Sequence, residues 1–330
     1  MTLSRLEPFR IEPAFVERIW GSRDLRPWYD FVAKGDPVGE VWLNGDQCKA
    51  ATGSLAGKTV GAIFAEYSEA MLGGSAPESA QGMSPLLMKV IFAKEKLSVQ
   101  VHPDDKLAQK YGQPRGKTEC WYALEAEPGA EVAAGLKPGV TLETVEAEVK
   151  DGTLEQSLEV VPVKAGDLVF VDAGTVHAIW PGSVLLETQQ NCDITYRLFD
   201  YGRPRELHVA KALEAIRLTT DAGKVTPKEL ADRTVLVDGA YFEVERVPVA
   251  GVRTDESLRK AGEADGLTYL FAAEGSGVIR PREAGAFAAV ELPKCGMAAV
   301  PAESAGWEIA SDGGGLEVIR IVTKWPGKTA

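Results

Sequence analysis

Short apolar segments separated by turn-forming residues run through most of this chain. The clearest lie within residues 86–200: LLMKVIFA (86–93), LSVQVH (97–102), ECWYALEA (119–126), EVAAGL (131–136), DLVFVDA (167–173), VLLETQQ (184–190) and DITYRLFD (193–200). Segments of this length and composition, bounded by Gly, Pro, Asp or Asn, are typical of β-strands. Regular strand–helix alternation and a glycine-rich phosphate loop are both missing. The pattern therefore predicts an antiparallel sandwich or barrel rather than a parallel sheet.

Three longer segments have the apolar spacing of helices and interrupt the predicted strands. They are 55–72, 141–158 and 205–218. Gly73 and Gly74 would end the first, and Thr141 or Thr144 would cap the second. The third would begin after Pro204. Its apolar face would carry Leu207, Ala210, Leu213 and Ile216.

Strand-like segments return beyond about residue 235. They are YFEVERVPV (241–249), GLTYLFAAEGSGVIR (266–280), AFAAVELPKCGMAAVP (286–301) and GLEVIRIVTK (315–324). Residues 167–180 and 291–309 share an outline of turn, apolar strand, small-residue turn and strand, but only the first has a histidine, His177. This predicts two β-domains, 1–235 with a metal site and 236–330 as a degenerate copy without metal ligands.

Charge and cysteine content narrow the classes of function. The net charge of −12 argues against nucleic acid as the main partner, because phosphate backbones need an extended basic surface. The four cysteines are scattered without a CxxC pair, which predicts a reduced, cytoplasmic chain. No apolar run approaches the ~20 residues that span a bilayer. The N-terminus has no signal-peptide core. We therefore expect a soluble protein.

Histidine is rare here, with three residues in the whole chain, and one of them lies in LSVQVHPDD (97–105). Side chains alternate between the faces of a strand, so Ser98, Gln100 and His102 project to one side. Three polar side chains on one face lie either against water or in an enclosed polar cavity.

Later segments repeat this pattern. Lys117 and Glu119 share a face in GKTECWYAL (116–124), and His177 follows a tight turn. Two imidazole nitrogens and two oxygens suit zinc or another first-row divalent metal. A metal site of this kind would form if four side chains converge inside one barrel: Gln100, His102, Glu119 and His177.

The same residues also have plainer interpretations. His102 alone could be a hydrogen-bonded structural histidine, and Lys117 with Glu119 could form a solvated strand face. Arg197 could be a structural ion-pair partner. Spacing alone leaves these alternatives open, since the convergence depends on how the strands close.

Several motifs resemble one known family. The segments LSVQVHPDD, GKTECWYAL, AGTVHAI and ETQQNCDITYRLFDYGR are similar to those of the type I mannose-6-phosphate isomerases, particularly the short bacterial form. ERIWG (17–21) and GEVWLNGD (39–46) resemble its N-terminal segments. The resemblance covers roughly residues 10–215, and the Gln-x-His-Pro-Asp motif is the most specific part. It extends to the remainder only in general character.

The resemblance implies a cupin (jelly-roll) fold, a cytoplasmic enzyme and one zinc ion per chain. The implied ligands are Gln100, His102, Glu119 and His177. Arg197 matches the arginine that the family treats as catalytic. Four further positions match residues that line the family's substrate pocket: Ser98, Lys117, Glu187 and Asp193.

The implied reaction interconverts mannose 6-phosphate and fructose 6-phosphate through an enediol, and it needs a base, an electrophile and a phosphate site. Arginine stays protonated, so Arg197 could stabilise an enediolate but is unsuited to act as base. The third histidine, His208, lies in the predicted helix 205–218, where a surface or capping contact is expected. Glu187, Lys117 or a metal-bound water remain as candidate bases.

The phosphate site has several candidate cations. They are Lys89, Lys117, Arg197, Arg203 and Arg205. Arg203 and Arg205 would precede a helix N-terminus, where backbone amides also favour anions. Two other functions compete with the isomerase: an iron-dependent cupin oxygenase, which would usually need more histidine ligands, and a sugar-phosphate sensor without catalysis. Oligomeric state is not predicted by any of these features.

Overall fold

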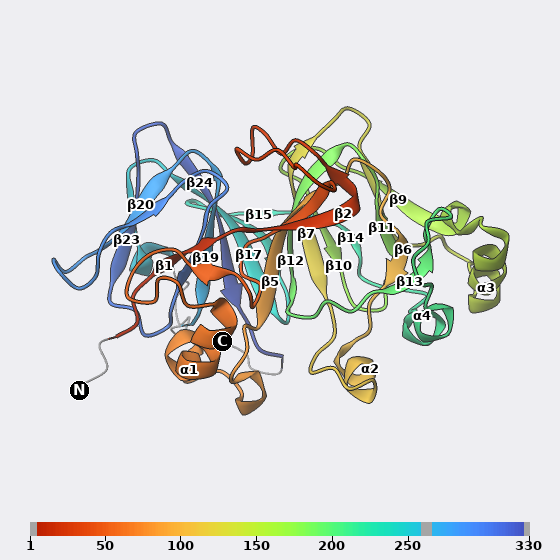
Figure 1. Ribbon diagram of the computed structural model, residues 1–330, viewed down its shortest axis with the longest axis horizontal. Helices are drawn as coiled ribbons and strands as arrows, with labels where there is room; N and C mark the ends of the chain where they lie inside the picture. Colours follow the sequence, from red (N-terminus) through yellow and green to blue (C-terminus); the bar gives the residue numbers. More distant parts are fainter. Residues whose placement is uncertain (1–4, 259–265, 327–330) are drawn as a thin grey trace. The chain divides into compact units, whose positions relative to one another are not determined.

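The computed structural model describes residues 5–258 and 266–326, which form a mainly β structure with a few inserted helices (Figure 1). This confirms the β-rich class predicted from the sequence. Within the described residues, no helix has both the length and the apolar character needed to cross a membrane.

The described residues group into two compact units, each assembled from separate segments of the chain. We call residues 15–41 and 86–225 the central unit. The terminal unit contains the remaining described residues: 5–14, 42–85, 226–258 and 266–326. The division at residue 235 stays a prediction, and these units differ from it because the first 85 residues contribute to both.

The central unit contains two sheets. The larger has the order β14 (Gly223–Lys224), β10 (Leu168–Val171), β7 (Glu119–Ala126), β12 (Ser183–Gln190), β5 (Leu86–Phe92), β3 (Val38–Trp42) and β2 (Ala14–Ser22). The smaller has the order β13 (Tyr196–Phe199), β6 (Val99–Val101), β11 (His177–Ile179), β8 (Glu131–Leu136) and β9 (Leu158–Pro162). β12 pairs antiparallel with both β5 and β7, so these three strands form the middle of the larger sheet.

Side-chain alternation decides what lies between these sheets. One buried cluster combines Trp121 and Leu185 of the larger sheet with Val132 and Ile179 of the smaller. A second cluster contains Val99 and other residues on the opposite face of the smaller sheet, together with side chains of two helices. Gln100 has the opposite parity to its neighbours in β6, and it therefore faces the larger sheet.

The terminal unit also contains two sheets. The larger has the order β15 (Lys228–Glu229), β16 (Thr234–Asp238), β17 (Phe242–Val249), β24 (Leu316–Thr323), β19 (Thr268–Glu274), β22 (Met297–Val300), β1 (Phe9–Glu12) and β4 (Lys49–Ala50). The smaller has the order β18 (Val252–Thr254), β23 (Trp307–Ser311), β20 (Gly277–Pro281) and β21 (Val290–Leu292). β1 pairs with β22, which places the N-terminal strand among C-terminal ones.

The two units repeat one topology. Across the larger sheets, β2, β3, β5, β12, β7, β10 and β14 correspond in order to β15, β16, β17, β24, β19, β22 and β1. In the smaller sheets, β6, β11, β8 and β9 correspond to β18, β23, β20 and β21. The β10–β11 and β22–β23 connections both pass from the larger sheet to the smaller. These connections lie in the two segments, 167–180 and 291–309, from which we predicted a duplication.

The helices agree with the sequence where capping signals are strong. α1 (Val60–Leu72) has Thr59 as its N-cap and lies inside the predicted 55–72. α3 (Leu142–Asp151) is capped by Thr141, and η2 (Leu154–Ser157) follows it. Three short helices were not predicted: α2 (Asp105–Lys110), α5 (Asp255–Leu258) and η1 (Glu78–Ala80).

The predicted helix 205–218 is wrong in its length and in its buried face. α4 (Val209–Ala215) is shorter. Arg205 lies outside it, because both of its guanidinium contacts go to Asp200. Leu207 is 43% exposed, whereas Ala212 and Ala215 are buried. The strong ion pair at Asp200 holds the chain after Pro204 away from the helical path.

Candidate active site

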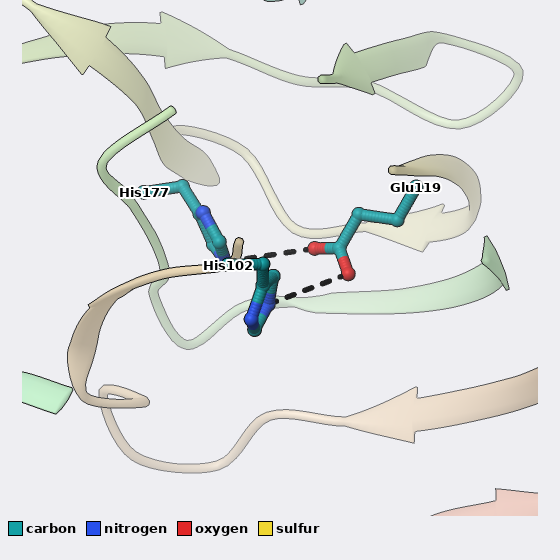
Figure 2. Close-up of side chains that lie close together, drawn as sticks. All are labelled: His102, Glu119 and His177. Atoms are coloured by element: carbon teal, nitrogen blue, oxygen red, sulfur yellow. Dashed lines mark ion pairs between the residues drawn. The ribbon is translucent and has the colours of Figure 1, made fainter. Parts of the chain in front are cut away.

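Three ionisable side chains from three strands meet between the sheets of the central unit (Figure 2). His102 directly follows β6, Glu119 begins β7 and His177 begins β11. The Glu119 oxygens lie 3.6 Å from His102 Nε2 and 3.5 Å from His177 Nε2. One potential ligand atom from each residue lies within 4.8 Å of the others. The strand parity deduced from the sequence thus brings these three together.

Gln100 lies beside this cluster. It is opposite His177 in the β6–β11 ladder, and its Nε2 is 3.2 Å from His177 Nε2. The Ser98 hydroxyl donates to Gln100 Oε1 at 3.1 Å. His177 Nδ1 lies 2.9 Å from the Thr175 carbonyl oxygen, so that nitrogen carries the proton and Nε2 keeps a lone pair. A partner of this kind is typical of histidines that bind metals.

Burial keeps both histidines neutral. Desolvation lowers the pKa of His177 to about 4 and the pKa of His102 well below its usual range, with the charge of Lys117 acting in the same direction. Desolvation raises the pKa of Glu119 to about 7, although Lys117 opposes this shift. His102 Nε2 makes no hydrogen bond with any described residue. The site thus contains two neutral imidazoles, one of them with an unsatisfied nitrogen, beside a carboxylate. This set of donor atoms suits a divalent cation.

A cavity of about 490 Å³ adjoins the cluster, since Gln100 and Lys117 line it. The sequence-predicted residues that line this cavity are Lys89, Ser98, Gln100, Lys117, Glu187, Asp193 and Arg197. His102, Glu119 and His177 are almost fully buried, with side chains 1% exposed. All of these residues belong to the central unit.

Two buried lysines lie among carboxylates at this cavity. Lys89 Nζ is 3.2 Å from Glu187 Oε1, 3.7 Å from Asp193 Oδ1 and 3.9 Å from Glu40 Oε2. Lys117 Nζ is 3.0 Å from Glu119 Oε2 and 3.9 Å from Glu187 Oε1. The Trp121 indole donates to Glu187 Oε2 at 3.2 Å.

These ion pairs fix the charge states. Burial lowers the pKa of each lysine, but the neighbouring carboxylates outweigh it, so both lysine pKa values are raised. Burial raises the pKa of Glu187, but Lys117 and Lys89 outweigh it, so the pKa is lowered overall. Glu187 is therefore ionised at neutral pH, and both lysines are protonated.

Arg197 approaches the same cavity from β13. Its Nη1 donates to the Glu206 carbonyl at 2.9 Å, and its Nε is buried without a hydrogen-bond partner among the described residues. Desolvation lowers the pKa of Arg197, and Arg205 acts in the same direction. His208 Nδ1 accepts a hydrogen bond from the Arg197 backbone N–H at 3.3 Å. His208 is the N-cap residue of α4, but its side chain makes no capping hydrogen bond and contacts the β13 backbone instead.

The two other predicted phosphate residues differ in position. Arg205 lines the cavity, whereas Arg203 pairs with Asp200 and donates to the Lys96 carbonyl. α4 begins four residues after Arg205. Both arginines therefore precede a helix N-terminus, and the assistance of its amides in binding an anion stays a prediction.

Sequence reasoning missed three charged residues of the cavity, Glu17, Arg18 and Glu40, and the last two pair with each other. Arg18 Nε and Nη2 donate to the two Glu40 oxygens at 3.1 and 2.9 Å. A signal was present in VGEVW (38–42), where a lone glutamate interrupts an apolar strand. A buried carboxylate in such a place needs a cationic partner.

Comparison with known proteins gives the chain its relatives. Residues 9–136 match the family model for the catalytic domain of type I phosphomannose isomerase. The mannose-6-phosphate isomerase ManA of Bacillus subtilis (strain 168) is 35% identical over 261 residues, covering 74% of this chain and 80% of the relative. The mannose-6-phosphate isomerase of Streptococcus mutans is 34% identical over 260 residues, with the same coverage of both chains.

A solved structure is similar over nearly the whole chain. The crystal structure of the mannose 6-phosphate isomerase from Bacillus subtilis superposes with a TM-score of 0.81 and 29% identity. It covers 96% of this chain and 99% of the solved one. The similarity therefore extends through both units, beyond the residues that the family model matches.

Metal content provides a direct test of the cluster. His102→Ala should abolish stoichiometric zinc binding, while the metal-free protein stays folded because the apolar clusters form without the site. Glu119→Gln should weaken zinc binding by at least about tenfold, since the ligand loses its charge. Zinc content after dialysis, measured by mass spectrometry beside far-UV circular dichroism, checks both variants. His208→Ala is the matched control and should keep its zinc. Full zinc content in both site variants would refute this ligand set.

Proposed function

The chain belongs to the type I mannose-6-phosphate isomerases, a family with a mainly β, cupin-type fold, and we propose that it interconverts mannose 6-phosphate and fructose 6-phosphate. Family membership rests on relatives about 35% identical over most of both chains. The observation that carries the proposal is the cavity itself. It joins a possible metal site to an ionised carboxylate, protonated lysines and three arginines.

The metal of this site is proposed to be zinc, one ion per chain. His102, Glu119, His177 and Gln100 would hold it, the last through its amide oxygen after rotation of the amide. A divalent cation there would polarise oxygens of a bound sugar. An iron-dependent oxygenase is not favoured, because the cluster among the described residues contains only two histidines. A non-catalytic sensor is not favoured either, because all the charged groups that isomerisation needs line one cavity.

The charge states distinguish between two of the candidate bases. Isomerisation moves a proton between C1 and C2, so the base must start without a proton. Glu187 has a lowered pKa and Lys117 a raised one. We therefore assign Glu187 as the base and Lys117 as a proton donor or oxyanion partner. The Trp121 hydrogen bond orients one Glu187 oxygen, leaving the carboxylate fixed at the cavity wall.

Arg197 would stabilise the enediolate. Arg197 is half-buried, and it lies on the strand next to Gln100, since the two residues are partners in the β13–β6 ladder. Ser98, Lys89 and Asp193 would contact substrate from other parts of the cavity wall.

The phosphate needs cations that are not fully neutralised. Lys89 and Lys117 are each surrounded by carboxylates, whereas Arg197, Arg203 and Arg205 share one buried acid, Asp200. Arg205, which lines the cavity, is therefore the best candidate for the phosphate. A cytoplasmic location is also proposed, in keeping with four buried free cysteines.

A coupled assay tests the proposed reaction. Purified protein should convert mannose 6-phosphate to fructose 6-phosphate at a rate far above that of unphosphorylated mannose, because the arginines favour an anionic substrate. Removal of metal by a chelator, verified by metal analysis, should reduce the rate at least about 100-fold, and added zinc should restore it. Full activity in a verified metal-free sample would exclude the metal from the reaction. Inactivity of the zinc-loaded protein would exclude the isomerase itself.

Kinetic measurements can distinguish whether Arg197 acts in the chemical step or only in substrate binding. An arginine beside C1–C2 acts mainly on charge that exists in the transition state, so its loss should lower kcat about 10²–10³-fold with a smaller change in KM. Arg197→Lys should recover little, since it loses the planar fork. Steady-state kinetics of Arg197→Lys and Arg197→Ala, both retaining zinc, check this. A large rise in KM with kcat nearly unchanged would instead make Arg197 a phosphate anchor.

A further inference from the structure

A row of alternating charges crosses four neighbouring strands of the central unit. It runs from Arg18 on β2 through Glu40 on β3 and Lys89 on β5 to Glu187 on β12. Successive partners are 2.9, 3.9 and 3.2 Å apart. Lys89 and Glu187 are direct cross-strand partners. The row begins at a partly exposed arginine and ends at the proposed base.

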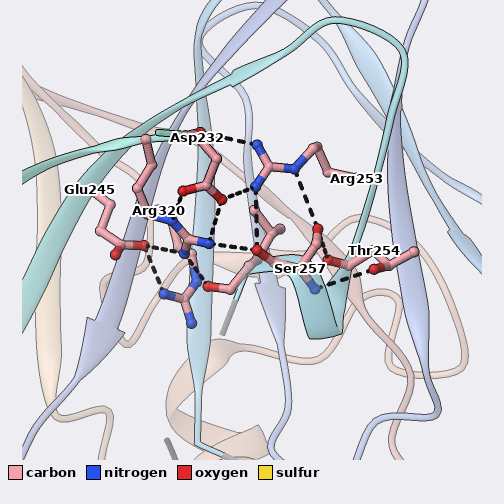
Figure 3. A network of polar contacts seen from close by, with 8 residues as sticks. Asp232, Glu245, Arg253, Thr254, Ser257 and Arg320 are labelled. Carbon is pink, nitrogen blue, oxygen red and sulfur yellow. Dashed lines mark hydrogen bonds and ion pairs between the residues drawn. The ribbon is translucent and has the colours of Figure 1, made fainter. Parts of the chain in front are cut away.

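The terminal unit has a comparable series of four alternating charges in which the signs are reversed (Figure 3). Asp232 and Arg233 precede β16, Glu245 lies on β17 and Arg320 on β24. Successive partners are 2.8, 3.3 and 2.8 Å apart. Glu245 and Arg320 are direct cross-strand partners, as Lys89 and Glu187 are in the central unit. The inner pairs therefore hold opposite charges at matching strand positions, whereas Asp232 and Arg233 lie in the turn before β16 rather than on two strands.

The two rows differ in what they contact. In the terminal unit, Arg233 donates to the carbonyls of Ser257 and Leu258, so backbone acceptors satisfy part of its guanidinium. In the central unit, every member of the row lines the 490 Å³ cavity. The terminal row contacts backbone carbonyls, whereas the central row lies at the wall of a cavity and can arrange groups around a substrate.

Local packing places Glu40 in this row. A Cβ on the preceding Gly39 would lie 2.5 Å from the Arg18 Cβ and 2.5 Å from the Trp20 ring, so only glycine allows β2 and β3 to approach this closely. This close approach allows the Arg18 guanidinium to donate hydrogen bonds to both Glu40 carboxylate oxygens. A carboxylate held at two points has little freedom to follow a moving ammonium group.

We propose that Glu40, held by Arg18, is a positioning residue that fixes the Lys89 ammonium and through it the orientation of the Glu187 carboxylate. This inference rests on the proposed isomerase function. Lys89 has three carboxylate partners, of which Asp193 is 57% exposed and Glu187 is the group to be positioned. Glu40 is therefore the buried one of the two remaining partners. It lies on β3, which flanks β5 on the side opposite the Glu187 strand β12. Without its charge, Lys89 moves toward Glu187 and Asp193.

The experiment compares matched variants of the two rows. Glu40→Gln keeps the shape of the side chain but removes its charge, and Glu245→Gln makes the same change in the terminal unit. Steady-state kinetics with mannose 6-phosphate, zinc content and the midpoint of thermal unfolding are measured for both. We expect Glu40→Gln to keep zinc and lose about 10- to 100-fold in kcat, with KM changed much less. Glu245→Gln should lower the unfolding midpoint and leave kcat and KM at wild-type values.

Substitutions at the outer residues of the two rows, Arg18 and Asp232, give a second pair of variants with smaller expected effects. Arg18→Gln should lower kcat about 3- to 10-fold, and Asp232→Asn should leave it unchanged. This pair decides the question if either inner variant fails to fold. Arg18→Gln combined with Glu40→Gln should lose no more kcat than Glu40→Gln alone, because both act through Lys89. Glu40→Asp, which restores the charge, should recover part of the lost kcat.

Three results would overturn the inference. Wild-type kcat in Glu40→Gln and Arg18→Gln, with a fall in unfolding midpoint like that of Glu245→Gln, would make the central row purely structural. A raised KM with unchanged kcat would make Glu40 a substrate-binding residue. An inactive wild-type protein would overturn the proposed function and this inference together, so the two failures are distinguishable.

Discussion

Ionisable side chains that are buried between two sheets impose the main constraint on this structure. Lys89, Lys117, Glu119 and Glu187 have side chains between 1% and 5% exposed. Removing such groups from water costs several kcal/mol per ion, and each must find opposite charge or a metal. The strands therefore have to hold each one within about 4 Å of a partner. That requirement gathers charged side chains around one cavity, where they could contact the proposed sugar-phosphate substrate.

The duplicated topology allows the two units to be compared at matching positions, and among the described residues only the central unit has a cluster that could hold a metal. Glu119 and Thr268 occupy matching places, since each begins its strand opposite a valine, Val171 and Val300. The terminal unit thus has a hydroxyl where the central unit has the Glu119 carboxylate, a possible metal ligand. Its buried charges satisfy one another and the backbone instead. A sheet built to hold buried ion pairs can serve either packing or chemistry, depending on which side chains reach a cavity.

Much of this could be predicted from sequence, because strand alternation alone places Gln100 and His102 on one face and identifies Glu119 as a possible ligand. The helix 205–218 could not, because the Arg205–Asp200 pair overrides the local apolar spacing. Glu40 and Arg18 were missed for a related reason. Glu40 pairs with Arg18 and with Lys89, which lie on separate strands far along the chain, and strand order brings them together. Long-range pairing of this kind leaves only a weak local signal.

The central claim is that an ionised carboxylate beside the metal site moves a proton between C2 and C1 of the sugar. Isomerisation of mannose 6-phosphate in D₂O, stopped at low conversion, measures this directly by NMR of the product. A carboxylate base exchanges its proton with solvent, so a substantial fraction of the fructose 6-phosphate should carry deuterium at C1. Product formed in D₂O with no deuterium at C1 would contradict the account, because the hydrogen would then have moved without passing through an exchangeable group.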